Sequence, residues 1–153
     1  MLDDYSYSVP IAKKFYLQIW RIINRFFFLN WFPPASFIRI FLARLFGAKI
    51  GKNCLIKPDV IIYDPSNLTF GDNVWIGENV DLYSLDKIII GCNVVVSQYC
   101  YFCTGSHSIS RNFATVSRPI VVQDGVWICA KSTILGGANI TSKTVVTAGS
   151  IKH

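Results

Sequence analysis

One histidine stands out among the residues that could carry out chemistry. His107 ends the stretch TGSH (104–107), and the chain's other histidine is its last residue, His153. An imidazole titrates close to neutral pH and can remove a proton from a hydroxyl there, so His107 is a candidate general base. The alternative is an exposed turn histidine without a role. Two features favour the base: histidine is nearly absent elsewhere, and an excursion loop follows His107 directly.

The cysteines indicate free thiols and no metal site. Cys100 and Cys103 have a spacing that zinc sites use, but no second CxxC pair or pair of histidines accompanies them. A carbonic anhydrase-like zinc centre would need three histidines, so we expect no metal. The five cysteines lie in a chain in which we recognise no export signal, which argues against a disulfide framework. They are Cys54, Cys92, Cys100, Cys103 and Cys129.

A six-residue repeat organises the chain from Ile50 onward. Thirteen blocks such as FGDNVW (70–75), IGENVD (76–81) and IGCNVV (90–95) begin with Ile, Val, Leu or Phe, and twelve have a small residue in fifth place. A period of six fits neither a helix nor a continuous strand, but it fits short strands joined by turns. We expect the first side chain to point inward, the fifth to lie inward near a corner, and Gly, Asn or Asp in between to form the turns. The pattern predicts a parallel β-solenoid.

Two segments break the repeat. Residues 62–69 interrupt the early part, and residues 108–121 are predicted to form an excursion loop immediately after His107. Insertions in a solenoid often gather on one face and form the binding site. In this reading, His107 takes the sixth place of the block FCTGSH (102–107), outside the packed core.

The N-terminal segment, residues 1–46, is basic and rich in aromatic residues. It is predicted to hold two helices, at about 11–30 and 35–46, separated by Pro33 and Pro34, with Gly47 ending the second. Residues 1–52 carry eight basic and two acidic groups, whereas the other 101 residues carry seven of each. Basic and aromatic residues together suggest contact with an anionic inner-membrane surface through residues 11–46. The alternative is that the aromatics pack on the solenoid and the basic groups are solvated. No nucleic-acid motif is present.

No segment is expected to span a membrane or to act as a signal peptide. The most apolar run, residues 15–32, has Arg21, Asn24 and Arg25 near its middle, and charges are costly inside a bilayer. Asp3 and Asp4 precede it, and no cleavage site follows. We therefore expect a cytoplasmic protein.

The chain resembles the hexapeptide-repeat acyltransferases, and specifically the sugar O-acetyltransferases that include those of colanic acid biosynthesis. The resemblance lies in LFGAKIGKN (45–53), LYSLDKIIIG (82–91), TGSH (104–107) and RPIVVQDGVWI (118–128). It implies a left-handed parallel β-helix over residues 47–153, assembled as a homotrimer. It also implies transfer of an acetyl group from acetyl-CoA to a hydroxyl of a surface polysaccharide or its precursor.

The same resemblance assigns roles to individual residues. His107 matches the general base, which acts by direct attack without a covalent enzyme intermediate. Ala130 and Ala148 match positions that contact the pantetheine arm of acetyl-CoA, with Trp127 close by. Asp81 and Tyr83 match the turn that contacts the acceptor sugar. For Asp81 and Trp127, a solvated carboxylate and an aromatic residue packed on the excursion loop remain alternatives.

Several positions depart from the family pattern. Turn glycines that the family uses are replaced by Gln123, Cys129, Thr141 and Thr147, and Ser108 follows the base where many relatives have Asp. Relatives continue beyond the position of His153, from which we expect a weaker coenzyme site. One alternative to the O-acetyltransferase is therefore a catalytically impaired β-helical scaffold. Another is an N-acyltransferase of an amino sugar, because the same base serves either nucleophile.

Overall fold

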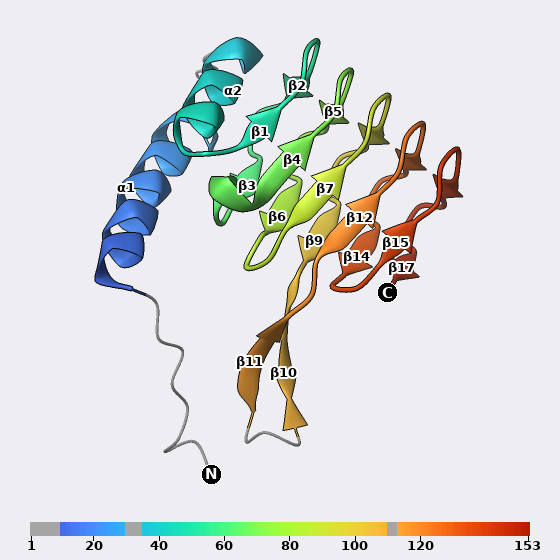
Figure 1. Ribbon diagram of the computed structural model, residues 1–153. Helices are drawn as coiled ribbons and strands as arrows, with labels where there is room; N and C mark the ends of the chain where they lie inside the picture. Colours follow the sequence, from blue (N-terminus) through green and yellow to red (C-terminus); the bar gives the residue numbers. More distant parts are fainter. Residues whose placement is uncertain (1–9, 30–34, 110–112) are drawn as a thin grey trace.

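The computed structural model describes residues 10–29, 35–109 and 113–153. Within these ranges, short strands wind into a parallel β-solenoid of about five turns, with two helices at its N-terminal end (Figure 1). The chain rises on the near side of Figure 1 and descends on the far side as it advances towards the C-terminus, which makes the coil left-handed. This confirms the predicted fold.

Three parallel sheets of five strands form the walls of the solenoid. Sheet A contains β1 (Lys49–Ile50), β4 (Leu68–Phe70), β7 (Ile88–Ile90), β12 (Ile120–Val122) and β15 (Asn139–Ile140). Sheet B contains β2 (Leu55–Ile56), β5 (Trp75–Ile76), β8 (Val95–Val96), β13 (Trp127–Ile128) and β16 (Val145–Val146). Sheet C contains β3 (Ile61–Ile62), β6 (Asp81–Tyr83), β9 (Tyr101–Cys103), β14 (Thr133–Leu135) and β17 (Ile151–Lys152).

The core consists of the side chains predicted to point inward. Residues in first place of the blocks stack in register from coil to coil, as Ile50 pairs with Phe70 and Phe70 with Ile90 in sheet A. All thirteen are buried, with exposed fractions of 8% or less. Most fifth-place residues are buried as well, for example Val60, Val74 and Ala138. Ser106 is an exception, because its side chain is exposed.

Residues in fourth place make the tight corners, and they do so with a left-handed backbone. Asn53, Asn73 and Asn93 have φ between 53° and 58°, and Gly125 has φ 70° at the equivalent corner one coil later. Asn and Gly adopt this conformation at least cost, which explains their choice here. The three asparagines also form a ladder, with amide hydrogen bonds of 3.3 and 2.9 Å between successive coils.

All variation in coil length falls at the corner between sheets C and A. Phe70 follows the inward-pointing Ile62 by eight positions, and the next coil repeats this spacing from Leu82 to Ile90. The block at 82–87 is therefore part of an eight-residue corner, and the segment 62–69, where a 3-10 turn (Pro65–Asn67) lies, is not the only interruption. The third coil carries the long insertion at the same corner. Insertions thus gather on one edge of the solenoid, as expected.

Two helices cover the N-terminal end of the solenoid: α1 (Ile11–Phe27) and α2 (Ser36–Leu45). Both are slightly shorter than predicted, and Pro33 and Pro34 lie outside the described residues. α2 ends as expected at Gly47, whose φ of 89° lets the next amide, that of Ala48, bond back to the carbonyl of Ala43.

These helices protect the open edge of the first coil. Arg44 donates to the last carbonyl of β1 at 2.7 Å, Arg39 to that of β2 at 2.9 Å, and Trp20 to that of β3 at 2.7 Å. Each sheet therefore has an edge carbonyl satisfied by a helix side chain. Burial lowers the pKa of Arg39, whose guanidinium still reaches a carbonyl.

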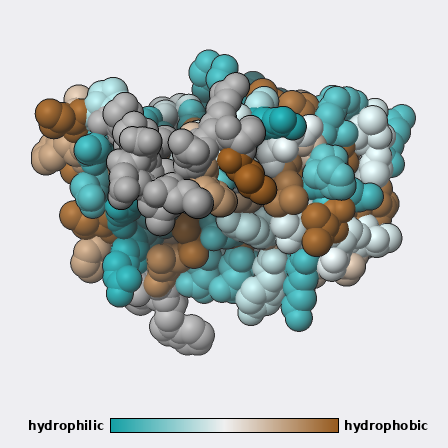
Figure 2. All heavy atoms as spheres, turned by 90° about the horizontal axis from the view of Figure 1, so that it is seen from below, coloured by the Kyte–Doolittle hydropathy of each residue, from teal (hydrophilic) through white to brown (hydrophobic). Residues whose placement is uncertain are grey.

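Part of the helical surface remains apolar and exposed. Trp20 and Phe28 pack into the core as the packing alternative predicted, but Phe15 and Phe26 are 70% and 62% exposed. In Figure 2, hydrophobic side chains interspersed with hydrophilic ones lie at the edge of the molecule where the helices are found. None of the helices in the described part of the chain is long and apolar enough to cross a bilayer.

Candidate active site

The insertion of the third coil is a β-hairpin and not an irregular loop. β10 (Gly105–Ser108) pairs antiparallel with β11 (Ala114–Ser117), so that His107 faces Thr115. The excursion therefore begins at Gly105, three residues before the predicted start at 108, and Ile120 already belongs to the wall strand β12. The hexapeptide reading of TGSH fails after Thr104 because these residues pair with β11 and leave the wall. This is why Ser106 is exposed.

Thr104 and Asp86 anchor the base of the hairpin. The Thr104 hydroxyl donates to the carbonyl of Tyr83 at 2.9 Å and accepts from the amide of Asp86 at 2.9 Å. The Thr104 carbonyl accepts from the amide of Arg118 at 3.0 Å, which closes the hairpin. Asp86 also accepts a hydrogen bond from the Ser117 hydroxyl at 3.2 Å. Asp86, the one large polar residue in fifth place, thus has a structural role in holding the hairpin.

The imidazole of His107 is oriented by the backbone of the same hairpin. Its Nδ1 lies 2.8 Å from the carbonyl oxygen of Phe113. A carbonyl can only accept, so Nδ1 carries the hydrogen, and in the neutral ring the lone pair belongs to Nε2. This is the tautomer of a general base that takes a proton on Nε2.

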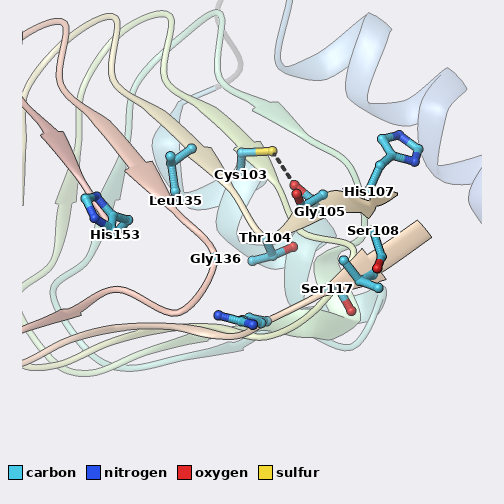
Figure 3. A pocket seen from close by; sticks show the side chains of 12 residues that line it. Cys103, Thr104, Gly105, His107, Ser108, Ser117, Leu135, Gly136 and His153 are labelled. Atoms are coloured by element: carbon cyan, nitrogen blue, oxygen red, sulfur yellow. Dashed lines mark hydrogen bonds between the residues drawn. The ribbon is translucent and has the colours of Figure 1, made fainter. Parts of the chain in front are cut away.

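A cavity of about 740 Å³ lies between the hairpin and the later coils. We call it the later-coil pocket. Figure 3 shows its walls: Thr104 at the hairpin base, Ser117 on β11, and Leu135 and Gly136 on the following coil. The His107 ring projects from β10 away from Leu135 and Gly136. The complete lining is Cys103, Thr104, Gly105, Ser106, His107, Ser108, Val116, Ser117, Arg118, Leu135, Gly136 and His153.

A second cavity, of about 550 Å³, lies on the opposite side, towards the earlier coils. We call it the earlier-coil pocket. Three tyrosines dominate its wall, Tyr63, Tyr83 and Tyr101, and the rings of Tyr63 and Tyr83 are 4.9 Å apart. The remaining lining residues are Leu85, Cys103, Gly105, Ser106, His107 and Thr115. His107 therefore borders both cavities.

Asp81 lies beside this aromatic wall and pairs in register with Tyr101. Burial raises the pKa of Asp81. Burial also raises the pKa of Tyr101, with further increases from nearby Cys103, Asp81 and Tyr83. Of the two residues predicted to contact the acceptor, Tyr83 thus lines the earlier-coil pocket, and Asp81 stands next to a residue that does.

The residues predicted to contact the coenzyme lie at a different corner from His107. Ala130 and Ala148 occupy equivalent turns between sheets B and C, and the amide of Gly149 donates to the Ala130 carbonyl at 3.0 Å. Trp127 stands outward on β13, half exposed, and its indole donates to the Ser97 hydroxyl at 3.0 Å. Within one chain, the structure does not bring these three residues together with His107 in either cavity.

The cysteines do not converge on a common point. Cys100 donates to the carbonyl of Cys129 at 3.2 Å, and Cys103 to that of Gly105 at 3.3 Å. All five are free thiols. Among the described residues, no three His, Cys, Asp or Glu side chains are grouped so that they could hold a metal ion.

Sequence reasoning overlooked several lining residues, although a signal for some of them was present. Tyr63 and Tyr83 are 20 residues apart, which is the length of each of the first two coils, so they occupy one column of sheet C. Arg118 and Gly136 carry no comparable signal. They reach the later-coil pocket because the hairpin returns to the wall beside them.

Comparison with known proteins finds relatives that are named acetyltransferases. The chain is 43% identical, over 98% of its length and 85% of the relative, to the Escherichia coli protein named "Putative colanic acid biosynthesis acetyltransferase WcaF". It is 30% identical to the galactoside O-acetyltransferase of E. coli, over 68% of this chain and 53% of that enzyme. No family model matches the chain.

Solved structures support the same fold. A hexapeptide-repeat acetyltransferase from Vibrio cholerae superimposes with a TM-score of 0.84 at 23% identity, over 94% of this chain and 82% of that chain. The same V. cholerae protein complexed with acetyl-CoA gives a TM-score of 0.80. With the sequence identity to WcaF over almost its entire length, the chain belongs to the hexapeptide-repeat acetyltransferase family and is an acyltransferase.

Proposed function

We propose that this protein transfers the acetyl group of acetyl-CoA to a sugar hydroxyl of a surface polysaccharide or its precursor. The observation that carries the proposal is the hydrogen bond between His107 Nδ1 and the Phe113 carbonyl, 2.8 Å long, on a hairpin that borders two cavities. It fixes the tautomer of a general base at a place where two substrates can approach from opposite sides.

The reaction needs His107 and no covalent enzyme intermediate. The acceptor hydroxyl gives its proton to His107 Nε2 while its oxygen attacks the thioester carbonyl carbon. The resulting tetrahedral intermediate collapses, the carbon–sulfur bond breaks, and the imidazolium returns the proton to the departing thiolate. The bond to Phe113 holds the ring in place throughout and stabilises the imidazolium, because a carbonyl dipole faces its Nδ1–H.

The earlier-coil pocket has the chemistry of a sugar site. Aromatic side chains pack against the apolar face of a pyranose ring, while tyrosine hydroxyls and Asp81 can bond its hydroxyls. We therefore assign Tyr63, Tyr83 and Tyr101 to the acceptor, together with the predicted Asp81. The name of the WcaF relative suggests a colanic acid-like polysaccharide, and that of the second relative a galactoside.

We assign Trp127, Ala130 and Ala148 to acetyl-CoA bound across a subunit boundary. These residues lie at the B–C corner, whereas His107 lies at the C–A corner, so a homotrimer would join the two sets. Exposed apolar side chains flank the B–C corner in register, as an interface requires. They are Trp75, Val95, Trp127 and Val145, which form one column of sheet B, and Ile61 and Ile151 on sheet C.

Replacement of the base tests this proposal. In His107→Gln, we expect release of CoA thiol with de-O-acetylated colanic acid or methyl galactoside as acceptor to fall by about 10²–10⁴-fold, the usual contribution of a general base. The side chain is exposed, so the fold should persist, and Lys143→Gln, an exposed residue outside both cavities, serves as the control. Unchanged transfer by His107→Gln would remove His107 from the mechanism.

Mixed assemblies test the shared site. Subunits with His107→Gln and subunits with Ala148→Trp should each be inactive alone. If the base and the coenzyme site come from different chains, mixing the two after gentle dissociation restores part of the activity. Absence of CoA binding in calorimetry, together with a correctly folded protein, would instead favour the scaffold alternative.

A further inference from the structure

Helix α1 has a second apolar face, opposite to the one that packs on the solenoid. Ile11, Phe15, Ile22 and Phe26 are 85%, 70%, 59% and 62% exposed. At about 100° per residue, the four side chains lie within a sector of roughly 60°. Trp20 points about 140° or more away from the centre of this sector, into the core, so the helix is apolar on two sides.

A basic sector borders this exposed apolar face. Lys14, Arg21 and Arg25 are exposed and fall within roughly 40° of one another on the helix, beside the apolar sector. No Asp or Glu occurs between residues 5 and 58. The exposed surface of α1 therefore combines apolar and basic side chains without an acidic residue of its own.

Helix α2 also carries an exposed apolar stripe. Phe37, Phe41 and Leu45 follow a spacing of four and form one exposed stripe, with exposed fractions of 71%, 63% and 68%. The opposite side of α2 packs on the first coil through residues that include Arg39, which caps β2. The packed side attaches α2 to the solenoid. The exposed apolar stripe takes no part in this contact.

We propose that the exposed face of α1, supported by the stripe of α2, binds the surface of a bilayer that contains anionic phospholipid. An apolar sector beside a basic sector is the arrangement of helices that lie in the headgroup region, where the apolar side chains enter the acyl boundary. The cations bind lipid phosphates at the same depth. A second copy of this chain would oppose the face with an equally basic helix, so charge favours the lipid.

The position of α1 next to the earlier-coil pocket would let the membrane contact assist acceptor binding, a consequence that rests on the proposed function. The guanidinium of Arg21, in the basic sector, lies 5.8 Å from the ring centre of Tyr63. Tyr63 lines the earlier-coil pocket, which we assign to the acceptor. The bilayer-bound helix therefore borders the acceptor pocket, and a sugar carried on a membrane lipid would be presented next to His107.

Sedimentation with vesicles tests the contact with the full chain. We expect binding to vesicles of phosphatidylcholine mixed with phosphatidylglycerol, weak binding to phosphatidylcholine alone, and loss of binding in high salt. Phe15→Ser with Phe26→Ser should weaken binding by about tenfold or more. Lys14→Gln with Arg25→Gln should weaken it by roughly tenfold or more, since each basic residue near such a surface contributes about fivefold.

Matched controls lie at the far end of the solenoid. Lys143→Gln, alone and combined with Lys152→Gln, removes exposed cations, and neither variant should change vesicle binding. Equal binding to both vesicle types, no binding, or unchanged binding by the α1 variants would each overturn the proposal. A change in oligomeric state in the phenylalanine variant would assign the face to a second copy and overturn it as well.

The outcome is separable from that of the proposed function. His107→Gln should bind vesicles like the unmodified chain, and the phenylalanine variant should still acetylate a soluble acceptor. If vesicle binding is absent while acetyl transfer persists, the proposed membrane contact is wrong and the proposed enzyme function is retained. If transfer is absent while vesicles are bound, the reverse holds.

Discussion

The two sides of the β10–β11 hairpin offer different chemistry to the same histidine. The later-coil pocket is walled in large part by small side chains, including Thr104 and Gly136, and Arg118 also lines it. The earlier-coil pocket is walled by three tyrosines. Small side chains leave main-chain groups accessible to an extended ligand, whereas an aromatic wall suits a ring. Under the proposed mechanism, this difference allows His107 to meet two unlike substrates.

The wall of the later-coil pocket is the more rigid of the two, and a substitution at Gly136 should disturb it most. A Cβ added there would lie 2.8 Å from the carbonyl oxygen of Thr104 and 3.0 Å from that of Arg118. Both oxygens belong to the backbone at the hairpin base, where neither can rotate away. We expect Gly136→Ala to lower the free energy of unfolding by about 1–3 kcal/mol, as overpacking does.

Thermal unfolding measures this loss, which should appear as a decrease in melting temperature of roughly 2–12 °C. Because the hairpin base carries the strand of His107, acetyl transfer should fall as well. A variant with unchanged melting temperature and unchanged transfer would show that the later-coil wall is more adaptable than its backbone contacts indicate.

A substitution at Gly105 tests the wall of the earlier-coil pocket, which consists of side chains that can move. A Cβ there would meet the side chains of Leu85 at 2.6 Å and Tyr83 at 3.1 Å. Side-chain ends can move, so Gly105→Ala should cost less stability than Gly136→Ala but should displace the aromatic wall. We expect the KM for the sugar acceptor to rise severalfold with little change in the KM for acetyl-CoA. Steady-state kinetics with each substrate varied in turn separates the two KM values, and a selective effect on the KM for acetyl-CoA would contradict the assignment of the earlier-coil pocket to the acceptor.

Much of this arrangement could be predicted from the sequence, because the repeat is a direct consequence of packing. A first-place residue such as Ile76 must fill the core, and a fourth-place residue such as Asn73 must adopt a left-handed backbone conformation. The structural role of both positions can therefore be predicted from the sequence. The insertion beside His107 was readable for the same reason, since it breaks the period. The predicted fold and the neighbourhood of His107 follow from these constraints.

Other features depend on strand pairing, carbonyl capping or subunit contacts, which leave no periodic pattern in the sequence. The sequence TGSH continues the hexapeptide pattern, yet Gly105 to Ser108 leave the wall because β11 offers them an antiparallel partner. Arg39 and Arg44 look like solvated cations, but they cap β2 and β1 because a solenoid edge leaves carbonyls open. The roles of Trp127, Ala130 and Ala148 depend on a neighbouring subunit, so they stay predictions.

The smallest expected effect concerns Asp81 beside the aromatic wall. Burial raises the pKa of Asp81 in the folded chain, so the folded state holds its proton more tightly than the unfolded state does. Stability attributable to this group is therefore lost as pH rises from the ordinary range of an aspartate through the raised value. Asp81→Asn has nearly the same shape without the charge, so it should melt slightly higher than the unmodified chain at neutral pH.

The gain should shrink towards zero in acid, where the carboxyl is protonated in both states. Melting temperatures of the two proteins across this pH range measure it, and a gain that is independent of pH would rule out the ionisation as its cause. Kinetics of the same variant then decides between the two readings of Asp81. If the carboxylate bonds the sugar, the more stable variant has a higher acceptor KM, because a stabilising substitution in a binding site removes an interaction that the ligand uses. If Asp81 is only a half-buried wall residue, stability rises and the acceptor KM stays the same.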